Sequence, residues 1–185
     1  MSRLLPLHYF YANEERPLPE IEWIEGADVP EPERSLLVHE RDMTSTLARF
    51  HGAPLELEVL ARELSSDYLM RMVVLRSRDT GAPVEFGAIG IRLEAFEGPI
   101  REQIATGMAP LGGLLEKHNL DYRSCPRGYF SLIADRRIGH ALGEHDGLRL
   151  YGRSNELTDA DGIVFADIVE VLPRSGGSSE TGGGA

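Results

Sequence analysis

The sequence predicts an α+β fold built around an antiparallel sheet. Strand-like segments occur in neighbouring pairs joined by turn residues, as at residues 79–83 and 158–162. Helical patterns fall between the strand pairs instead of after each strand, which argues against a parallel sheet with βαβ connections. The 185 residues suffice for one domain whose core needs no disulfide bond.

The two ends of the chain differ in composition from the middle. Residues 1–34 are rich in proline and acidic residues, and we interpret them as an extended arm anchored by Ile21, Trp23 and Ile24. Residues 174–185 (RSGGSSETGGGA) contain too little apolar surface to offset the entropy of ordering, which predicts a disordered tail. We therefore expect the folded domain at residues 35–173.

The first elements expected in this domain are a helix and a strand. Asp42 and Thr44 are typical N-cap residues, and they precede a short helical pattern that ends at Gly52. Residues 55–59 alternate apolar side chains with glutamate, which predicts a half-exposed strand.

Two longer strands follow at residues 69–78 and 84–93. The second of them contains Gly87 and Gly90, and glycine inside a strand indicates close approach by a ligand or another element. The remaining pattern predicts helices at 99–105 and 110–118, a strand at 128–134, a helix at 135–142, and a final hairpin with strands at 149–157 and 163–172.

Charge and residue usage exclude several classes of protein. A net charge of −11 does not suit a nucleic-acid-binding protein. No apolar run reaches the roughly 18 residues of a membrane span, and residues 1–10 lack a signal-peptide cleavage site. Cys125 is the single cysteine, the histidines lack metal-site spacing, and nucleotide-binding and serine-hydrolase motifs are absent. We therefore expect a cytoplasmic protein without a metal or cofactor.

Arg71 stands where the strand pattern requires an apolar residue. It shares a strand face with Leu69, Val73 and Leu75, and a buried guanidinium is costly unless it is paired. One explanation is a structural salt bridge or a sheet edge that lets the side chain reach water. The other is an anchor for an anion, because the planar guanidinium matches a carboxylate in a bidentate manner.

The final hairpin raises a similar question. Asp167 shares a face with Val169, so it either pairs with an arginine or faces a cavity as a proton donor or acceptor. Glu170 lies on the other face, where we expect a solvated carboxylate. On the preceding strand, Arg153 has two possible roles, as the partner of Asp167 or as a second cationic site.

A set of short motifs occurs in a fixed order along most of residues 36–173. They are RDMT at 41–44, LMR at 69–71, VEFGA at 84–88, PLG at 110–112, LYGR at 150–153 and IVEVLP at 168–173. Together they resemble the chorismate pyruvate-lyase-like superfamily, in particular its branch of small bacterial proteins of the mycobacterial type.

The resemblance implies helices packed over the antiparallel sheet and an enclosed pocket. It implies catalytic roles for Arg71 and for an acid on the last strand. One register of that strand places Asp167 at the acid and another places Val169 there, and the alternation favours Asp167. The implied substrate-binding residues are Met43, Leu111, Gly112 and Arg153. The PLGG segment at residues 110–113 has two possible explanations: exposed N–H groups at a helix N-terminus that bind an anion, or a simple tight turn.

The implied activity is elimination of pyruvate from chorismate to give 4-hydroxybenzoate, without a cofactor. The chain departs from the classical lyases at Ala88 and Ser154, where those enzymes carry arginines, which favours a different or smaller anionic ligand. The alternative is a non-catalytic domain that binds an aromatic acid, as in the effector-sensing domains of transcription regulators, although no helix-turn-helix pattern is present. In both cases the expected partner is a small aromatic or enolpyruvyl carboxylate, not nucleic acid or a membrane.

Overall fold

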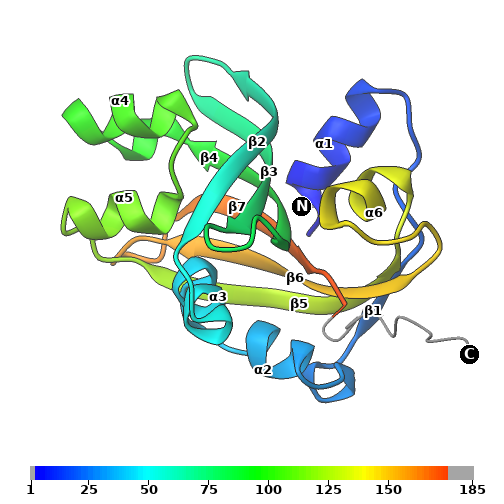
Figure 1. Cartoon of the computed structure of the whole chain (residues 1–185). Helices are drawn as coiled ribbons and strands as arrows, with labels where there is room; N and C mark the ends of the chain where they lie inside the picture. The colour runs from blue at the N-terminus through cyan, green and yellow to red at the C-terminus, as the bar shows by residue number, and fades with distance from the viewer. Residues whose placement is uncertain (1–2, 175–185) are drawn as a thin grey trace, which may run out of the picture.

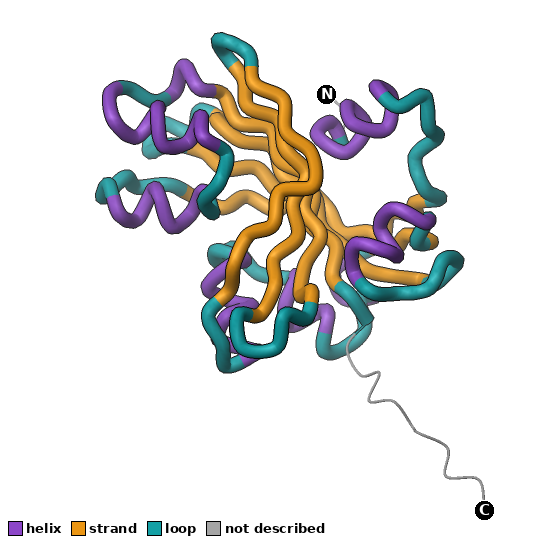
Figure 2. Tube along the Cα trace, turned by 45° about the horizontal axis from the view of Figure 1, so that its top comes forward, coloured by secondary structure: helices purple, strands orange, loops and turns teal. Residues whose placement is uncertain are grey.

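The computed structural model describes residues 3–174, which form a twisted seven-stranded sheet in the order β1-β5-β6-β7-β4-β3-β2 (Figures 1 and 2). Every neighbouring pair in this sheet is antiparallel, so the predicted α+β class is confirmed. The strands are β1 (Ile21–Ile24), β2 (Leu55–Leu64), β3 (Tyr68–Ser77), β4 (Pro83–Arg92), β5 (Arg123–Ile133), β6 (Arg149–Thr158) and β7 (Val164–Leu172).

Helices cover both faces of the sheet, and their placement divides the apolar core into separate clusters. The helices are α1 (Leu5–Asn13), α2 (Glu33–Leu37), α3 (Met43–His51), α4 (Gly98–Thr106), α5 (Leu111–Lys117) and α6 (Arg136–Leu142). Helices α1 and α6 lie on one side of the central strands and α4 and α5 on the other (Figure 1). No helix in residues 3–174 is long and apolar enough to cross a membrane.

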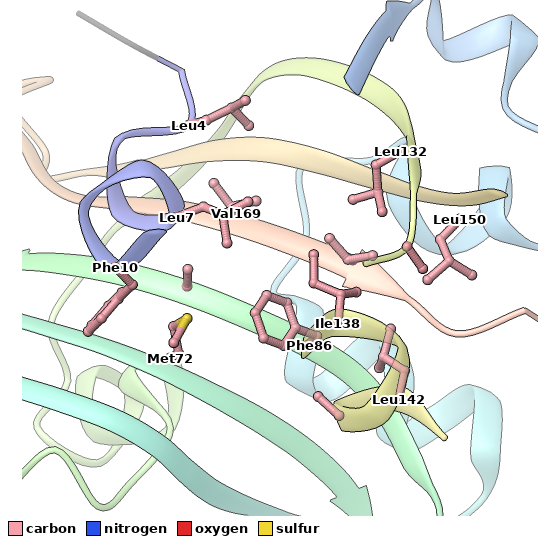
Figure 3. Close-up of a cluster of buried hydrophobic side chains, with 14 of the residues drawn as sticks. Leu4, Leu7, Phe10, Met72, Phe86, Leu132, Ile138, Leu142, Leu150 and Val169 are labelled. Atoms are coloured by element: carbon pink, nitrogen blue, oxygen red, sulfur yellow. The ribbon is translucent and has the colours of Figure 1, made fainter. Parts of the chain in front are cut away.

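The N-terminal segment corrects one expectation. Instead of an extended arm, it contains helix α1, whose Leu7 and Phe10 are buried against Met72 and Phe86 of the sheet (Figure 3). Strand β1 then pairs with β5, so the anchors expected at Ile21–Ile24 are present as a strand. Residues 3–34 therefore complete both the sheet and the core. Of the tail predicted at residues 174–185, all but Arg174 lies outside the described residues.

Removal of the Leu7 side chain tests this assignment. Leu7 is completely buried, and truncating a buried leucine to alanine typically costs about 2–5 kcal/mol. We expect Leu7→Ala to lower the free energy of unfolding by an amount in this range, measured by denaturant titration. A loss below about 0.5 kcal/mol, the usual range for a surface position, would show that α1 is not part of the core in solution.

On the face that carries α3, α4 and α5, the apolar packing is interrupted. One cluster joins α4 and α5 to the sheet around Leu69 and Ile91, and a second joins α2 and α3 to it around Leu75 and Leu172. Between these two clusters, along β3, lie Arg71 and Val73. The interruption leaves a pocket on this face of the sheet.

Candidate ligand-binding site

The pocket lies between the two apolar clusters and encloses a volume of about 70 Å³. Two rows of neighbouring side chains across β3, β4, β7 and β6 form its floor. The first row is Val73, Gly87, Glu170 and Arg153, and the second is Arg71, Ile89, Ile168 and Asn155. The rim includes residues at the starts of α3 and α5, which are Asp42, Met43, Thr44, Pro110, Leu111 and Gly112. Charged groups therefore meet a largely apolar lining.

Arg71 is the cation of this pocket that has no acidic partner. Its side chain is buried, with a residue exposure of 3%, and Nη1 donates a hydrogen bond to the carbonyl of Gly107, just after α4. Among the described residues no carboxylate forms an ion pair with it, and its Nε lacks any hydrogen-bond partner. Burial lowers the pKa of Arg71 to about 10, so the guanidinium remains charged at neutral pH.

Arg153 is also buried, but its charge is already compensated. Its Nε donates to Glu170 across β6 and β7, and both side chains are at most 5% exposed. Its Nη1 donates to the carbonyls of Leu37 and His39, at 3.2 and 2.9 Å. Of the two possible roles, the structure therefore favours a structural ion pair, although the partner is Glu170 and not Asp167.

Glu85 is a second carboxyl group in the pocket wall. It is buried, and its Oε2 has no hydrogen-bond partner among residues 3–174. Burial is the largest cause that raises its pKa well above the ordinary value, and the charges of Glu170 and Asp42 add to the effect while Arg153 opposes it. Its neutral form is therefore favoured up to a higher pH than that of an exposed glutamate.

The starts of two helices meet at the rim. Asp42 caps α3, its carboxylate accepting a hydrogen bond from the N–H of Ser45. A Cβ on Gly112 would lie 2.6 Å from Oδ1 of Asp42, so only glycine allows α5 to approach α3 this closely. Met43 and Leu111 are the first residues of α3 and α5, where backbone N–H groups have no acceptor within the helix.

Asp167 is the predicted site residue that the structure places elsewhere. The pocket lining contains its neighbours on β7, Ile168 and Glu170, whereas Asp167 is absent from it. Because side chains alternate along a strand, Asp167 belongs to the opposite face, with Val169 packed in the α1 and α6 cluster. Asp167 does share a face with Val169, as the alternation predicts, but the pocket lies on the other face of the sheet.

Replacement of Asp167 tests this placement. Burial raises its pKa above 3.8, with Glu156 adding to the shift and Arg92 opposing it. A raised carboxyl pKa stabilises the fold below the unfolded pKa, and this contribution is lost as pH rises through the folded pKa. We expect Asp167→Asn to remove that decrease in a pH series of unfolding free energies and to change ligand affinity by less than about twofold. A tenfold loss of affinity would place Asp167 in the site after all.

Sequence reasoning missed the two glutamates of the pocket. Glu85 shares its strand face with Gly87, Ile89 and Ile91, so the rule that identified Arg71, a charge on an apolar face, applies equally to it. Glu170 was expected to be solvated, but β7 is buried on both faces and Glu170 is 4% exposed.

Comparisons with known proteins establish the fold. The sequence matches no family model and no curated protein. PhnF from Mycobacterium smegmatis has a TM-score of 0.57 and 14% identity over 73% of this chain, which spans only 64% of PhnF. The effector domain of PhnF gives the same score and identity over 71% of this chain and 87% of that domain. The ligand-binding domain of a protein described as a GntR-family transcriptional regulator from Bordetella bronchiseptica has a TM-score of 0.53 and 14% identity. The match covers 66% of this chain and 86% of that domain.

These structures correct the expected activity. The three similar structures share the fold of this chain; two of them are an effector domain and a ligand-binding domain, and none of them is named as a lyase. The expectation of a carbon–oxygen lyase that acts on chorismate and releases pyruvate is therefore wrong. The pocket agrees with this correction, because Asp167, the expected catalytic acid, is not in its lining.

Proposed function

We propose that this chain is a non-catalytic ligand-binding domain of the effector type, and that its pocket holds a small organic acid by its carboxylate. The observation that carries the proposal is the buried Arg71 guanidinium, which has no acidic partner within the described part of the chain. A buried charge in this state is costly, and an anionic ligand would remove the cost by supplying the missing acceptor.

The surroundings of Arg71 suit the two parts of such a ligand. The first turn of α3 borders the pocket, and its backbone N–H groups that Asp42 does not cap favour a negative charge there. Leu57, Ile89, Leu111 and Leu157 provide apolar surface for the body of the ligand. In this proposal Met43, Leu111 and Gly112 keep the binding roles expected of them, Arg71 binds the ligand instead of taking part in catalysis, and Arg153 supports the pocket through Glu170.

The size of the pocket limits the ligand. A volume of about 70 Å³ is roughly five times the smallest space that holds one water molecule. A compact acid fits such a space directly. An aromatic acid fits only if side chains of the lining change their conformation to enlarge the pocket. Met43 is best suited to this because its side chain is unbranched and flexible.

Titration calorimetry with the whole chain tests the proposal. We expect propionate or benzoate to bind in a saturable manner with one site per chain, and inorganic phosphate to bind more weakly because the pocket wall is largely apolar. Saturable binding of phosphate without binding of either carboxylate would mean that the ligand of this pocket is a different kind of anion. No binding of any of the three acids at millimolar concentration would contradict the proposed function.

A further inference from the structure

The end of the pocket opposite Arg71 is acidic. Arg71 and Leu75 are four residues apart on β3, which corresponds to about 13 Å along the strand, and Glu85 is the cross-strand neighbour of Leu75. A ligand held by Arg71 at one end therefore extends towards Glu85 at the other. Gly87 lies between them on β4, with no side chain to block the way.

The side chain of Glu85 lies beside the space above Gly87. A Cβ placed on Gly87 would lie 3.3 Å from Oε1 of Glu85 and 3.2 Å from a methyl group of Val73. The carboxyl group of Glu85 thus borders the space that Gly87 leaves open. Its Oε2 is buried and has no hydrogen-bond partner among the described residues, so the group can still form a hydrogen bond.

The charges around Glu85 decide which hydrogen bond it forms. The groups that face it are Glu170 on β7, Arg153 on β6 and Asp42 before α3. Arg153 is the one cation among them, and it donates Nε to Glu170. Two buried carboxylates beside one cation do not both ionise readily, and the one without a donor retains its proton.

We propose that Glu85 is a specificity-determining residue that donates a hydrogen bond from its neutral carboxyl group to an uncharged acceptor oxygen at the far end of the ligand. The pocket then selects monocarboxylates that carry a carbonyl, amide or hydroxyl group opposite the carboxylate. It rejects dicarboxylates of the same shape, because their second carboxylate meets Glu170 with no uncommitted cation nearby. This inference rests on the proposed binding of an acid by Arg71.

Two pairs of nearly isosteric probes test the selectivity. Succinate and terephthalate are dianions, and levulinate and 4-acetylbenzoate are nearly isosteric monoanions whose ketone oxygen can only accept a hydrogen bond. The two lengths allow for the size of the pocket. We expect calorimetry at pH 7 to show at least about tenfold tighter binding of the ketone that fits the pocket than of its dianion, since like charges brought together at an interface cost several kcal/mol.

Variants at Glu85 identify the residue responsible. Glu85→Leu removes the donor and is expected to reduce the affinity for the ketone relative to the affinity for benzoate by about 2- to 10-fold. Glu85→Gln keeps a neutral donor, so the affinity for the ketone should become independent of pH, whereas in the wild type it falls as pH rises and Glu85 ionises. Asp167→Asn, which replaces a half-buried carboxyl on the opposite face, is the matched control and should behave as the wild type.

The outcomes separate the inference from the proposed function. Equal or tighter binding of the dianion, or a Glu85→Gln variant that keeps the wild-type pH dependence, overturns the role of Glu85 while leaving acid binding by Arg71 intact. If no acid of either length binds the wild-type chain, both fail together. A carbon-13 NMR titration of the ligand-free chain adds a check, because a Glu85 carboxyl that is ionised at pH 7 also contradicts the inference.

Discussion

Arg71→Met is expected to weaken carboxylate binding by about 10- to 100-fold, which corresponds to the 1.5–3 kcal/mol of a charge-assisted hydrogen bond. The variant keeps the length and apolar character of the side chain but removes the charge and the planar donors. Because no carboxylate among residues 3–174 pairs with Arg71, the substitution leaves no buried charge behind and the variant should fold. The affinity is measured by calorimetry with the tightest acid found for the wild type.

Arg62→Met provides the matched control for this result. Arg62 is the cross-strand neighbour of Arg71 and, like it, donates a hydrogen bond to a carbonyl at the end of α4. It is exposed and does not line the pocket. Its removal should change acid affinity by less than about threefold, since exposed charges have small effects. Equal losses of acid affinity in the two variants would mean that the general positive charge of this region attracts the acid, and that the guanidinium of Arg71 has no specific role.

Arg153→Met is expected to produce the largest loss of stability. The substitution leaves Glu170 buried without its cation, and breaking a buried ion pair from one side typically costs about 3–5 kcal/mol. The free energy of unfolding from denaturant titration at pH 7 measures the effect.

A second substitution shows whether the ion pair is the cause. Replacing both partners of a buried pair by apolar residues is often neutral or stabilising, so Arg153→Met with Glu170→Leu should recover much of the loss. Arg149→Met on the same strand removes a half-exposed ion pair with Glu22 and should cost less than about 1 kcal/mol. A double variant no more stable than Arg153→Met alone would contradict the explanation.

The strands could be predicted where the chain alternates regularly and turns sharply. Strands β3 and β4 and the hairpin of β6 and β7 lie within two residues of their predicted bounds. Helix α1 was not predicted, because its sequence, LPLHYFYAN, is apolar on nearly every side and includes Pro6. Such a segment has no helical periodicity that could be recognised. Strand β5 was predicted too short because its pairing shifts between Pro126 and Gly128, where the alternation breaks.

The candidate site could be predicted only in part, for a related reason. Alternation states which residues share a strand face, and it found Arg71 as a charge among apolar neighbours. It does not state which face of the sheet carries a pocket, and that choice decides between Asp167 and Glu170. The pairing of Arg153 with Glu170 depends on the neighbouring positions of β6 and β7, which short-range patterns do not contain.

The most direct test of the account is the Nε–H resonance of Arg71 in a nitrogen-15 NMR titration with the acid. In the ligand-free chain this group has no hydrogen-bond partner, and the resonance is assigned by its absence from Arg71→Lys. The account predicts a saturable shift of this resonance that follows the calorimetric binding curve, with the Nε–H of Arg153 little changed. Saturable binding of the acid that leaves the Arg71 resonance unmoved would contradict it.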